Sequence, residues 1–308
     1  MGDASRTTSR RAVAIVGAGA LGRVLARRLT QQGYPVTAVL SRQRASARAL
    51  AREVGAPVGS DAWNDLPLDV SVVMVCVPDD AIPAVAASLA DLPRDWASTV
   101  VGHTSGARTA EALAPLARAG AATFSFHPMQ TFTSESDPSA FDGIYVGLEG
   151  DPDAVPFGAQ LAGDLGAQAV RVPAEAKTRY HLAAAVASNG LVALMGMVNE
   201  IIASAGLDAD DGWALMQPLI ERTQANVAAH APEGALTGPA ARGDLKTVNA
   251  HLEALATHLP HLLPAYAALT NEMVRLAVRS GRLDAGQAEP VLDVLHNALQ
   301  ERDSPSAG

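Results

Sequence analysis

The most constraining feature of this chain is the stretch over residues 12–22, AVAIVGAGALG. An apolar run rich in β-branched residues leads directly into Gly17, Gly19 and Gly22, and a helix-forming segment follows. Glycines at this spacing, between a strand and a helix, are typical of a dinucleotide-binding turn. Gly17 would make the turn, Gly19 would let the backbone approach a pyrophosphate, and Gly22 would let helix and strand pack closely. A glycine-rich turn without a ligand is the alternative.

The helix after this turn would bind the pyrophosphate, because unpaired N–H groups and the helix dipole favour an anion at a helix N-terminus. A continuous apolar run over residues 69–77 predicts a central strand whose end lines the same crevice. The residues predicted to hold the cofactor at these two places are Gly17, Gly19, Ala20, Leu21, Gly22, Val77 and Pro78.

The end of the second predicted strand, at residues 34–40, bears on which nicotinamide cofactor binds. In sites that prefer NAD, an acidic residue there binds the ribose 2′-hydroxyl. Here Ser41, Arg42 and Arg44 follow the strand, so a hydroxyl and two guanidinium groups are available and no carboxylate is. Guanidinium groups hold a phosphate with paired, charge-assisted hydrogen bonds. The sequence therefore predicts NADP(H), unless the arginines merely solvate a helix start.

The two halves of the chain differ in their pattern. Up to residue 172, strand-like and helix-like segments alternate, which predicts an α/β domain with a doubly wound parallel sheet of the Rossmann type. The strands are expected at 13–16, 34–40, 69–77, 98–102, 121–126, 144–148 and 169–172. After Pro173 long Ala/Leu-rich helical segments take over. We predict a disordered tail at 1–10, an NADP-binding domain at 11–172, an all-α substrate and dimerisation domain at 173–300 and a disordered tail at 301–308.

Composition and charge exclude several classes of protein. The formal net charge of −9, without a basic block, argues against nucleic-acid binding. The single cysteine, Cys76, excludes an internal disulfide and any Cys-rich metal site, and we predict no metal. We find no run that we judge long and apolar enough to span a membrane, and the first residues lack the apolar region of a signal peptide. A cytoplasmic protein is expected, with a homodimer formed through the apolar helices of the second half.

Two polar loops follow predicted strands, where ligands bind in sheets of this type. The loop at 102–106 contains His103, Thr104 and Ser105, and the segment at 126–130 contains His127. We predict that these four side chains contact a small-molecule substrate. For the first loop a capped turn is the alternative, and for His127 the alternative is a histidine satisfied by the backbone.

A further polar group lies at the start of the first long helix. At 100° per residue, Lys177, His181 and Ser188 fall within about 40° of one another, with Asn189 on the flank. Burying a lysine and a histidine unpaired is costly, which favours a functional stripe over a structural one. In the loop at 236–244, Arg242 could bind a substrate carboxylate, or could pair with an acidic neighbour in a Gly/Pro turn.

The motifs together resemble one bacterial family, proposed NADP oxidoreductases with a Rossmann-like domain followed by a helical domain of unknown function. The matching motifs are GAGALG at 17–22, GHTSGA at 102–107, FHPMQTF at 126–132, K..YH..A...SN at 177–189 and LTGPAARGD at 236–244. They occur in the expected order over nearly the whole chain.

More distantly, the layout is similar to the 6-phosphogluconate and β-hydroxyacid dehydrogenases, including ketopantoate reductases. Members use a lysine on the interdomain helix as acid/base and an asparagine one turn on. Lys177 matches that lysine, whereas His181 takes the next-turn position. The resemblance implies NADPH-dependent reduction of a small 2-oxo acid, ketopantoate first. Lys177 or His181 would donate the proton, and Asn189, Ser105 and His127 would orient the substrate.

Three alternatives stay open at this point. The first is an imine reductase acting on a pyrroline carboxylate. The second is an enzyme similar to prephenate dehydrogenases, which the HPM at 127–129 resembles. The third is a sensor that binds NADP(H) without turnover.

Overall fold

The computed structural model describes residues 10–300, without the side chains of residues 209–211. The chain forms two compact units, unit 1 up to Ser188 and unit 2 from Asn189 onward. Each unit is described by itself below. The predicted tail at 301–308, and all but the last residue of the tail at 1–10, lie outside the described residues.

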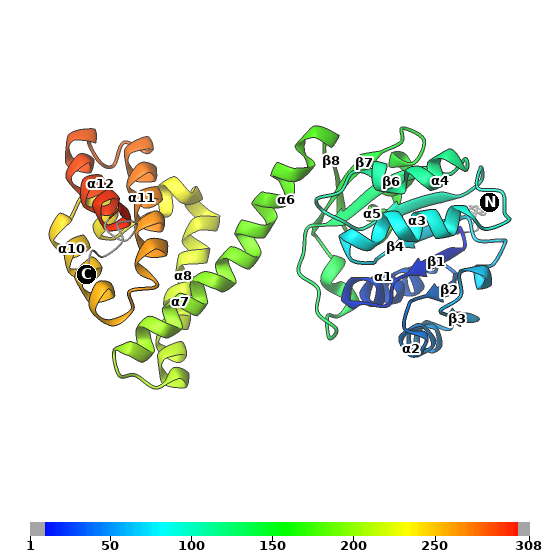
Figure 1. The fold of residues 1–308 in the computed structure, drawn as a ribbon, viewed down its shortest axis with the longest axis horizontal. Helices are drawn as coiled ribbons and strands as arrows, with labels where there is room; N and C mark the ends of the chain where they lie inside the picture. Colours follow the sequence, from blue (N-terminus) through cyan, green and yellow to red (C-terminus); the bar gives the residue numbers. More distant parts are fainter. Residues whose placement is uncertain (1–9, 301–308) are drawn as a thin grey trace, which may run out of the picture. The chain divides into compact units, whose positions relative to one another are not determined.

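Unit 1 contains a single eight-stranded sheet in the order β3-β2-β1-β4-β5-β6-β7-β8 (Figure 1). All strands from β3 to β6 in this order are parallel, and β1 lies between β2 and β4. The strand order therefore reverses at β1, which is where ligands bind beyond the carboxyl ends of such strands. The strands are β1 (Val13–Val16), β2 (Val36–Leu40), β3 (Val58–Ser60), β4 (Val72–Val75), β5 (Val100–His103), β6 (Ala122–Pro128), β7 (Tyr145–Gly150) and β8 (Gln168–Arg171). The predicted Rossmann-type α/β fold is confirmed.

Helices cover both faces of this sheet. In β1, Val13 and Ile15 pack into one core, whereas Ala14 and Val16 pack into the other. The first core is closed by α1 (Ala20–Gln31), α2 (Arg44–Val54) and α5 (Val155–Asp164). The second is closed by α3 (Ile82–Ala90), which follows the short helix η2 (Asp79–Ala81), and by η3 (Ala110–Leu113) and α4 (Ala114–Arg118). Burial on both faces explains why the strands read as continuous apolar runs.

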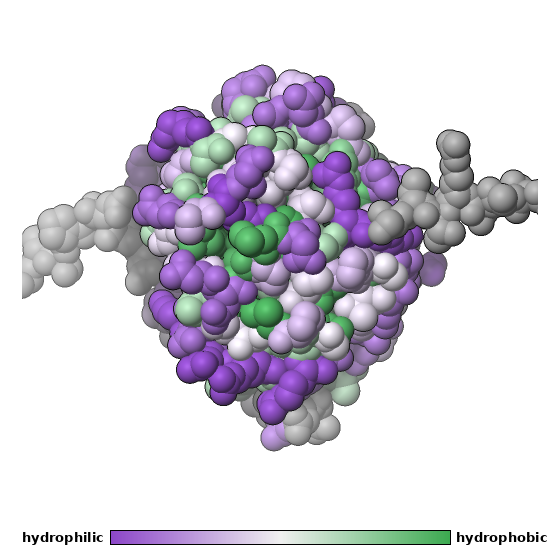
Figure 2. Space-filling view, turned by 90° about the vertical axis from the view of Figure 1, so that its right-hand side faces the viewer, coloured by the Kyte–Doolittle hydropathy of each residue, from purple (hydrophilic) through white to green (hydrophobic). Residues whose placement is uncertain are grey.

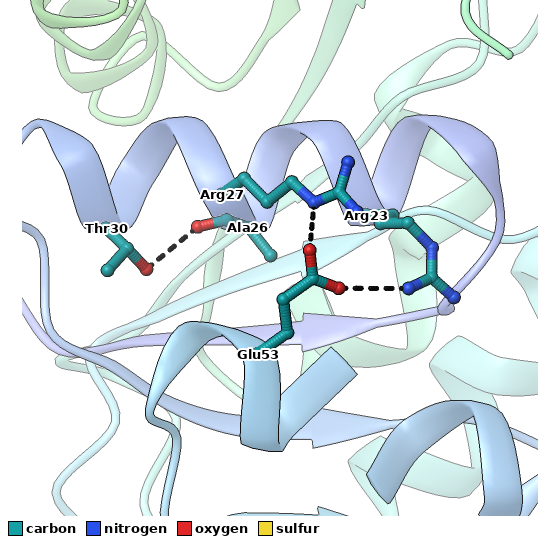
Figure 3. A network of polar contacts seen from close by, with 5 residues as sticks. All are labelled: Arg23, Ala26, Arg27, Thr30 and Glu53. Carbon is teal, nitrogen blue, oxygen red and sulfur yellow. Dashed lines mark hydrogen bonds and ion pairs between the residues drawn. The ribbon is translucent and has the colours of Figure 1, made fainter. Parts of the chain in front are cut away.

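An ionic contact joins the outer surfaces of α1 and α2 (Figure 3). The carboxylate of Glu53 accepts hydrogen bonds from Arg23 at 3.1 Å and from Arg27. On the same helix, the Thr30 hydroxyl donates to the Ala26 carbonyl at 2.9 Å. These groups are partly exposed, so each pair contributes at most about 1 kcal/mol to stability. The surface of unit 1 seen in Figure 2 is mostly hydrophilic, with a small hydrophobic area near its centre.

The sheet departs from the predicted all-parallel arrangement at its far edge. β7 runs antiparallel to β6, while β8 is parallel to β7. The link between β6 and β7 contains only the short helix η4 (Pro138–Phe141), without the crossover helix that usually joins parallel neighbours. Strand β3 and helix α5 were not predicted, because three residues give no periodicity and the segment of α5 has mixed character.

Unit 2 is helical over its described residues. Its helices are α7 (Leu191–Ser204), α8 (Ala209–Ala235), α9 (Pro239–Arg242), α10 (Leu245–His258), α11 (Leu263–Arg279) and α12 (Ala285–Gln300). Helices α9 to α12 share one core. The backbone of α8 leaves the helical conformation at Ala231, whose φ is +56°.

A long helical stretch leads from unit 1 into unit 2. It comprises η5 (Ala174–Ala176), α6 (Lys177–Ala185), the π-helical turn η6 (Val186–Gly190) and α7. The compact units divide within this stretch and not at the predicted boundary near Pro173, because α6 contacts the sheet of unit 1 through Lys177. By length and composition alone, Ala174–Ser204 could cross a membrane, with a hydropathy of 1.6. That finding corrects the prediction that no run has these properties.

Candidate active site

The glycine turn has the shape that a pyrophosphate requires. Gly17 has a φ of +110°, and a Cβ there would collide with the carbonyl oxygen of Cys76, while a Cβ on Gly22 would collide with that of Gly17. Both glycines are therefore needed for close packing of β1, β4 and α1. At Gly19, by contrast, an added Cβ would meet nothing within 4 Å. Its backbone faces open space at the start of α1, whose first N–H groups receive no side-chain cap. These residues fit a bound pyrophosphate.

The end of β2 fits a ribose 2′-phosphate. Ser41 is fixed by its N–H, which donates to the Ser60 carbonyl at 3.0 Å. Arg42 and Arg44 are exposed, and the Arg44 guanidinium lies 3.5 Å from Asp61. No carboxylate directly follows β2, and the acidic partner of Arg44, Asp61, follows β3. The other residues predicted to hold the cofactor also lie near the turn: Ala20 and Leu21 begin α1, and Val77 and Pro78 follow β4. Cofactor contacts by these residues stay predictions.

Lys177, the first residue of α6, is buried with 1% of its surface exposed. It lies against the edge of the sheet formed by the carboxyl ends of the parallel strands, called the ligand edge below. Its Nζ donates to Ser125 Oγ at 2.7 Å and to the Ser105 carbonyl at 3.1 Å. Burial lowers the pKa of Lys177 to about 8, and the charges of Glu149 and Asp79 oppose this shift. Among the ion pairs of the described residues, none within 4 Å involves Lys177. The site therefore contains a buried cation without a paired carboxylate.

Two imidazole rings lie next to this lysine. His127 Nδ1 is 3.0 Å from the Tyr180 hydroxyl, and the rings of His127 and His181 are 5.9 Å apart, edge to face. Burial first, and then the positive charge of Lys177, lower the pKa of His127 to about 4, so this ring is neutral at neutral pH. A Cβ added to Gly106 would lie 2.5 Å from His181 Nδ1 and 2.7 Å from His127 Nε2. Both nitrogens therefore pack closely against Gly106, which leaves no room for a side chain there.

The loop after β5 differs from its predicted role. His103 is fully buried, its Nε2 donates to the Thr109 carbonyl at 2.9 Å, and its Nδ1 accepts from the Ser105 N–H at 3.1 Å. Burial lowers the pKa of His103 to about 4. Both ring nitrogens are used within the loop, so the structure contradicts a substrate contact by His103.

Ser105 is also occupied within this loop. Its hydroxyl donates to Asp79 at 2.7 Å and accepts from the Arg108 N–H at 3.0 Å. The neighbouring Thr104 is 8% exposed. The capped-turn alternative therefore describes Ser105 better than a substrate contact through its hydroxyl, and its carbonyl is the group that contacts Lys177. A substrate contact by Thr104 stays a prediction.

The predicted helical stripe does not extend beyond His181. Ser188 and Asn189 lie in the π-helical turn η6, which has more residues per turn than an α-helix, so the constant spacing of 100° fails there. Asn189 and Arg242 belong to unit 2, where Arg242 ends α9 and is exposed. The acidic neighbour Asp244 caps α10 by accepting from the Thr247 N–H at 3.1 Å. The roles of Ser188, Asn189 and Arg242 stay predictions.

Sequence reasoning missed four residues of this cluster. Ser125 precedes His127 by two residues and so lies on the same face of β6. The alternation of side chains along a strand could have indicated this from the sequence. Tyr180 lies three residues after Lys177, at a spacing that places both on one side of a helix. Nothing in the sequence pairs Asp79 with Ser105, because 26 residues separate them. Gly106 is recognised only when the two imidazoles are seen beside it.

The fold and this cluster define a Rossmann-like protein with a buried lysine and two imidazoles at the ligand edge of its sheet. Residues 2–128 match the sequence model of Rossmann-like domains, and residues 144–273 match that of a domain of unknown function, DUF2520. These two matches lie in the order that the motifs predict, which confirms the resemblance. A search of curated protein sequences finds no match.

Solved structures share this fold over most of the chain. A proposed NADP oxidoreductase from Bacteroides fragilis, BF3122, has a TM-score of 0.73 at 24% identity, covering 87% of this chain and 99% of that one. Protein TM1727 from Thermotoga maritima has a TM-score of 0.68 at 29% identity, covering 88% and 100%. An imine reductase from Myxococcus stipitatus in complex with NADP⁺ has a TM-score of 0.58 at 16% identity, covering 94% of each chain.

Proposed function

We propose that this protein is an NADP(H)-dependent oxidoreductase that reduces the carbonyl group of a small 2-oxo acid. The observation that supports this most is the buried Lys177 ammonium group, which has no paired carboxylate and lies beside a neutral imidazole. The glycine turn and the arginines after β2 would hold the cofactor. When bound, NADPH supplies the hydride, and the protein supplies orientation and charge.

The electrostatics of the cluster favour a carbonyl substrate over an imine. Hydride addition to a carbonyl carbon places negative charge on the oxygen, which a buried cation and N–H donors stabilise. A protonated imine would instead bring a second positive charge next to Lys177, in a site of low dielectric. Imine reduction remains the alternative, because a structural neighbour is an imine reductase that binds NADP⁺.

The proton for the alkoxide is assigned to Lys177. Two of its three N–H groups are bound by Ser105 and Ser125, so one remains to donate. A pKa of about 8 lies near the working pH, as efficient general acid catalysis requires. His181, whose Nδ1 is buried without a hydrogen-bond partner among the described residues, is the alternative donor.

The test is NADPH oxidation with ketopantoate, with pyrroline-5-carboxylate in parallel and prephenate plus NADP⁺ in the reverse direction. We expect turnover of the 2-oxo acid, loss of turnover by orders of magnitude in Lys177→Ala, and nearly unchanged NADPH binding. A matched control is Lys246→Ala, which changes the other lysine of the sequence, an exposed residue of unit 2. Turnover of the imine alone would establish the alternative. Tight NADPH binding without turnover of any compound would leave a sensor.

We also propose that a second copy of this chain covers the apolar surface of α7 and α8. Val192 is 70% exposed, Leu215 59% and Leu219 63%, which is far more than a lone soluble helix pair usually shows. Burial of each large apolar side chain would contribute about 1.5–3 kcal/mol.

Sedimentation velocity tests this interface. We expect a dimer for the wild type and a shift to monomer for Leu219→Glu, with no shift for Met273→Glu on α11, a site that is 38% exposed. A wild-type monomer would contradict the proposal. Flotation of the protein with lipid vesicles would contradict it in favour of a membrane contact by the apolar helix.

A further inference from the structure

We propose that Tyr180 holds His127 as the neutral imidazole with its proton on Nε2, so that His127 offers the substrate a hydrogen-bond donor and not a base. The identity of the acceptor, the carbonyl oxygen of the substrate, rests on the proposed function. The tautomer and its cause rest on the contacts of Tyr180 alone.

The position of Tyr180 is set by a glycine in the neighbouring strand. Gly147 of β7 pairs with His127 of β6, and a Cβ added to Gly147 would lie 2.5 Å from the Tyr180 oxygen. Because Gly147 has no side chain, the phenol can lie directly against the strand pair. Its oxygen thereby comes within 3.0 Å of His127 Nδ1.

The direction of the Tyr180 hydrogen bond follows from its surroundings. Burial raises the pKa of Tyr180, so the phenol keeps its proton. The backbone of Gly147 opposes this shift. The O–H of a phenol is a stronger acid than the N–H of a neutral imidazole, so the favoured bond runs from the Tyr180 hydroxyl to His127 Nδ1, 3.0 Å away.

A neutral imidazole with an accepting Nδ1 must have its proton on Nε2. The ring stays neutral because it is mostly buried and faces the ammonium group of Lys177, with His181 and His103 adding to the effect and Asp79 opposing it. His127 Nε2 is therefore an N–H donor, and it has no lone pair with which to remove a proton from a substrate.

The ring edge that carries His127 Nε2 lies against Gly106, next to His181 Nδ1, which is buried without a partner among the described residues. His127 Nε2 itself has no hydrogen-bond partner among the described residues, so its N–H group is left for a ligand. A carbonyl oxygen matches this N–H, and a neutral donor of this kind stabilises a developing oxyanion without transferring its proton.

Nitrogen NMR tests the tautomer without any substrate. In protein labelled with ¹⁵N-histidine, long-range ¹H–¹⁵N correlation spectra at neutral pH distinguish the two tautomers and the imidazolium, and His127→Gln identifies the His127 signals. We expect the Nε2–H pattern in the wild type and a shift toward a mixture in Tyr180→Phe. Tyr34→Phe is the control, because Tyr34 is also a buried phenol with a polar partner, Asp164, away from the cluster. An Nδ1–H or imidazolium pattern in the wild type, or an unchanged pattern in Tyr180→Phe, would overturn the proposal.

Kinetics test whether the donor serves the substrate. The amide of His127→Gln keeps an N–H group near the Nε2 position, whereas His127→Ala removes it. We expect kcat to fall by about tenfold or less in the Gln variant and by about a hundredfold or more in the Ala variant. Equal losses in both would contradict the role as donor. If no carbonyl compound is reduced by the wild type, the proposed function fails, and the spectra still decide the tautomer.

Discussion

The ammonium nitrogen of Lys177 lies 2.7 Å from the hydroxyl oxygen of Ser125, although 52 residues separate them in the chain. Strand β6 provides the serine and the first turn of α6 provides the lysine. Their hydrogen bond fixes the start of the long helix to the ligand edge of the sheet. Two neutral acceptors do not fully replace the water that a buried cation loses, so this arrangement costs stability.

The stability cost predicts an unusual effect of replacing Lys177 by methionine. The pKa of Lys177 is about 8 when folded, against 10.5 as its ordinary value. At neutral pH the lysine is charged in both states, and Lys177→Met should raise the free energy of unfolding by up to about 3 kcal/mol, since each pKa unit corresponds to about 1.4 kcal/mol. The exposed Lys246→Met should change little. Urea unfolding at neutral pH measures both variants.

The difference between the folded and the ordinary pKa of Lys177 also predicts how the extra stability of Lys177→Met depends on pH. Between pH 8 and 10.5 the unfolded chain binds more protons than the folded one, so the wild type gains stability as pH rises. The gap between the wild type and Lys177→Met should therefore shrink through this range. A gap that stays constant from neutral pH to above pH 10.5 would contradict a lowered pKa for Lys177.

The pH dependence of turnover should identify the proton donor. If Lys177 protonates the alkoxide, kcat for carbonyl reduction falls as pH rises through about 8, because the folded enzyme then loses the required proton. In Lys177→Arg the residual rate should show no such fall, since a guanidinium keeps its proton. His181→Ala should retain the fall of the wild type. A fall that disappears in His181→Ala and persists in Lys177→Arg would assign the donor to His181.

The sequence predicted the fold more completely than the site, for physical reasons. Strands such as β1 and β4 are buried on both faces, so local composition reports them directly, and the glycine turn has a fixed spacing. The contacts of the site depend on distant segments. The sequence suggested that His103 contacts the substrate. The hydrogen bonds of its ring to the backbone of Thr109 and Ser105 form only in the folded loop, so the sequence could not show that both ring nitrogens are already occupied. The polar stripe that begins at Lys177 and His181 was predicted to extend too far along the helix. The π-helical turn after Ala185 changes the angular spacing of the residues that follow it.

Gly19 should be required for cofactor binding and not for folding. An added Cβ meets nothing within 4 Å in the protein itself, but it would occupy the space of the pyrophosphate. We expect Gly19→Ala to keep the melting temperature of the wild type and to weaken NADPH binding by tenfold or more in a fluorescence titration. Gly163→Ala in α5, also without neighbours within 4 Å, should leave NADPH binding unchanged. Gly17→Ala should instead destabilise the fold, because its Cβ collides with backbone. Normal NADPH affinity in Gly19→Ala would exclude the pyrophosphate from this turn.

Arg42 should determine the preference for NADPH over NADH. It is exposed directly after β2, where a ribose 2′-phosphate would lie, and Arg44 beside it already contacts Asp61. A charge-assisted hydrogen bond contributes about 1.5–3 kcal/mol, so Arg42→Ala should weaken NADPH binding by roughly tenfold to a hundredfold. NADH lacks the phosphate, and its affinity should not change. Arg52→Ala, which removes an exposed arginine from the last turn of α2, is the matched control. Equal losses for the two cofactors would show that Arg42 contacts a part they share, and the basis of NADP(H) selectivity would then lie elsewhere than at the end of β2.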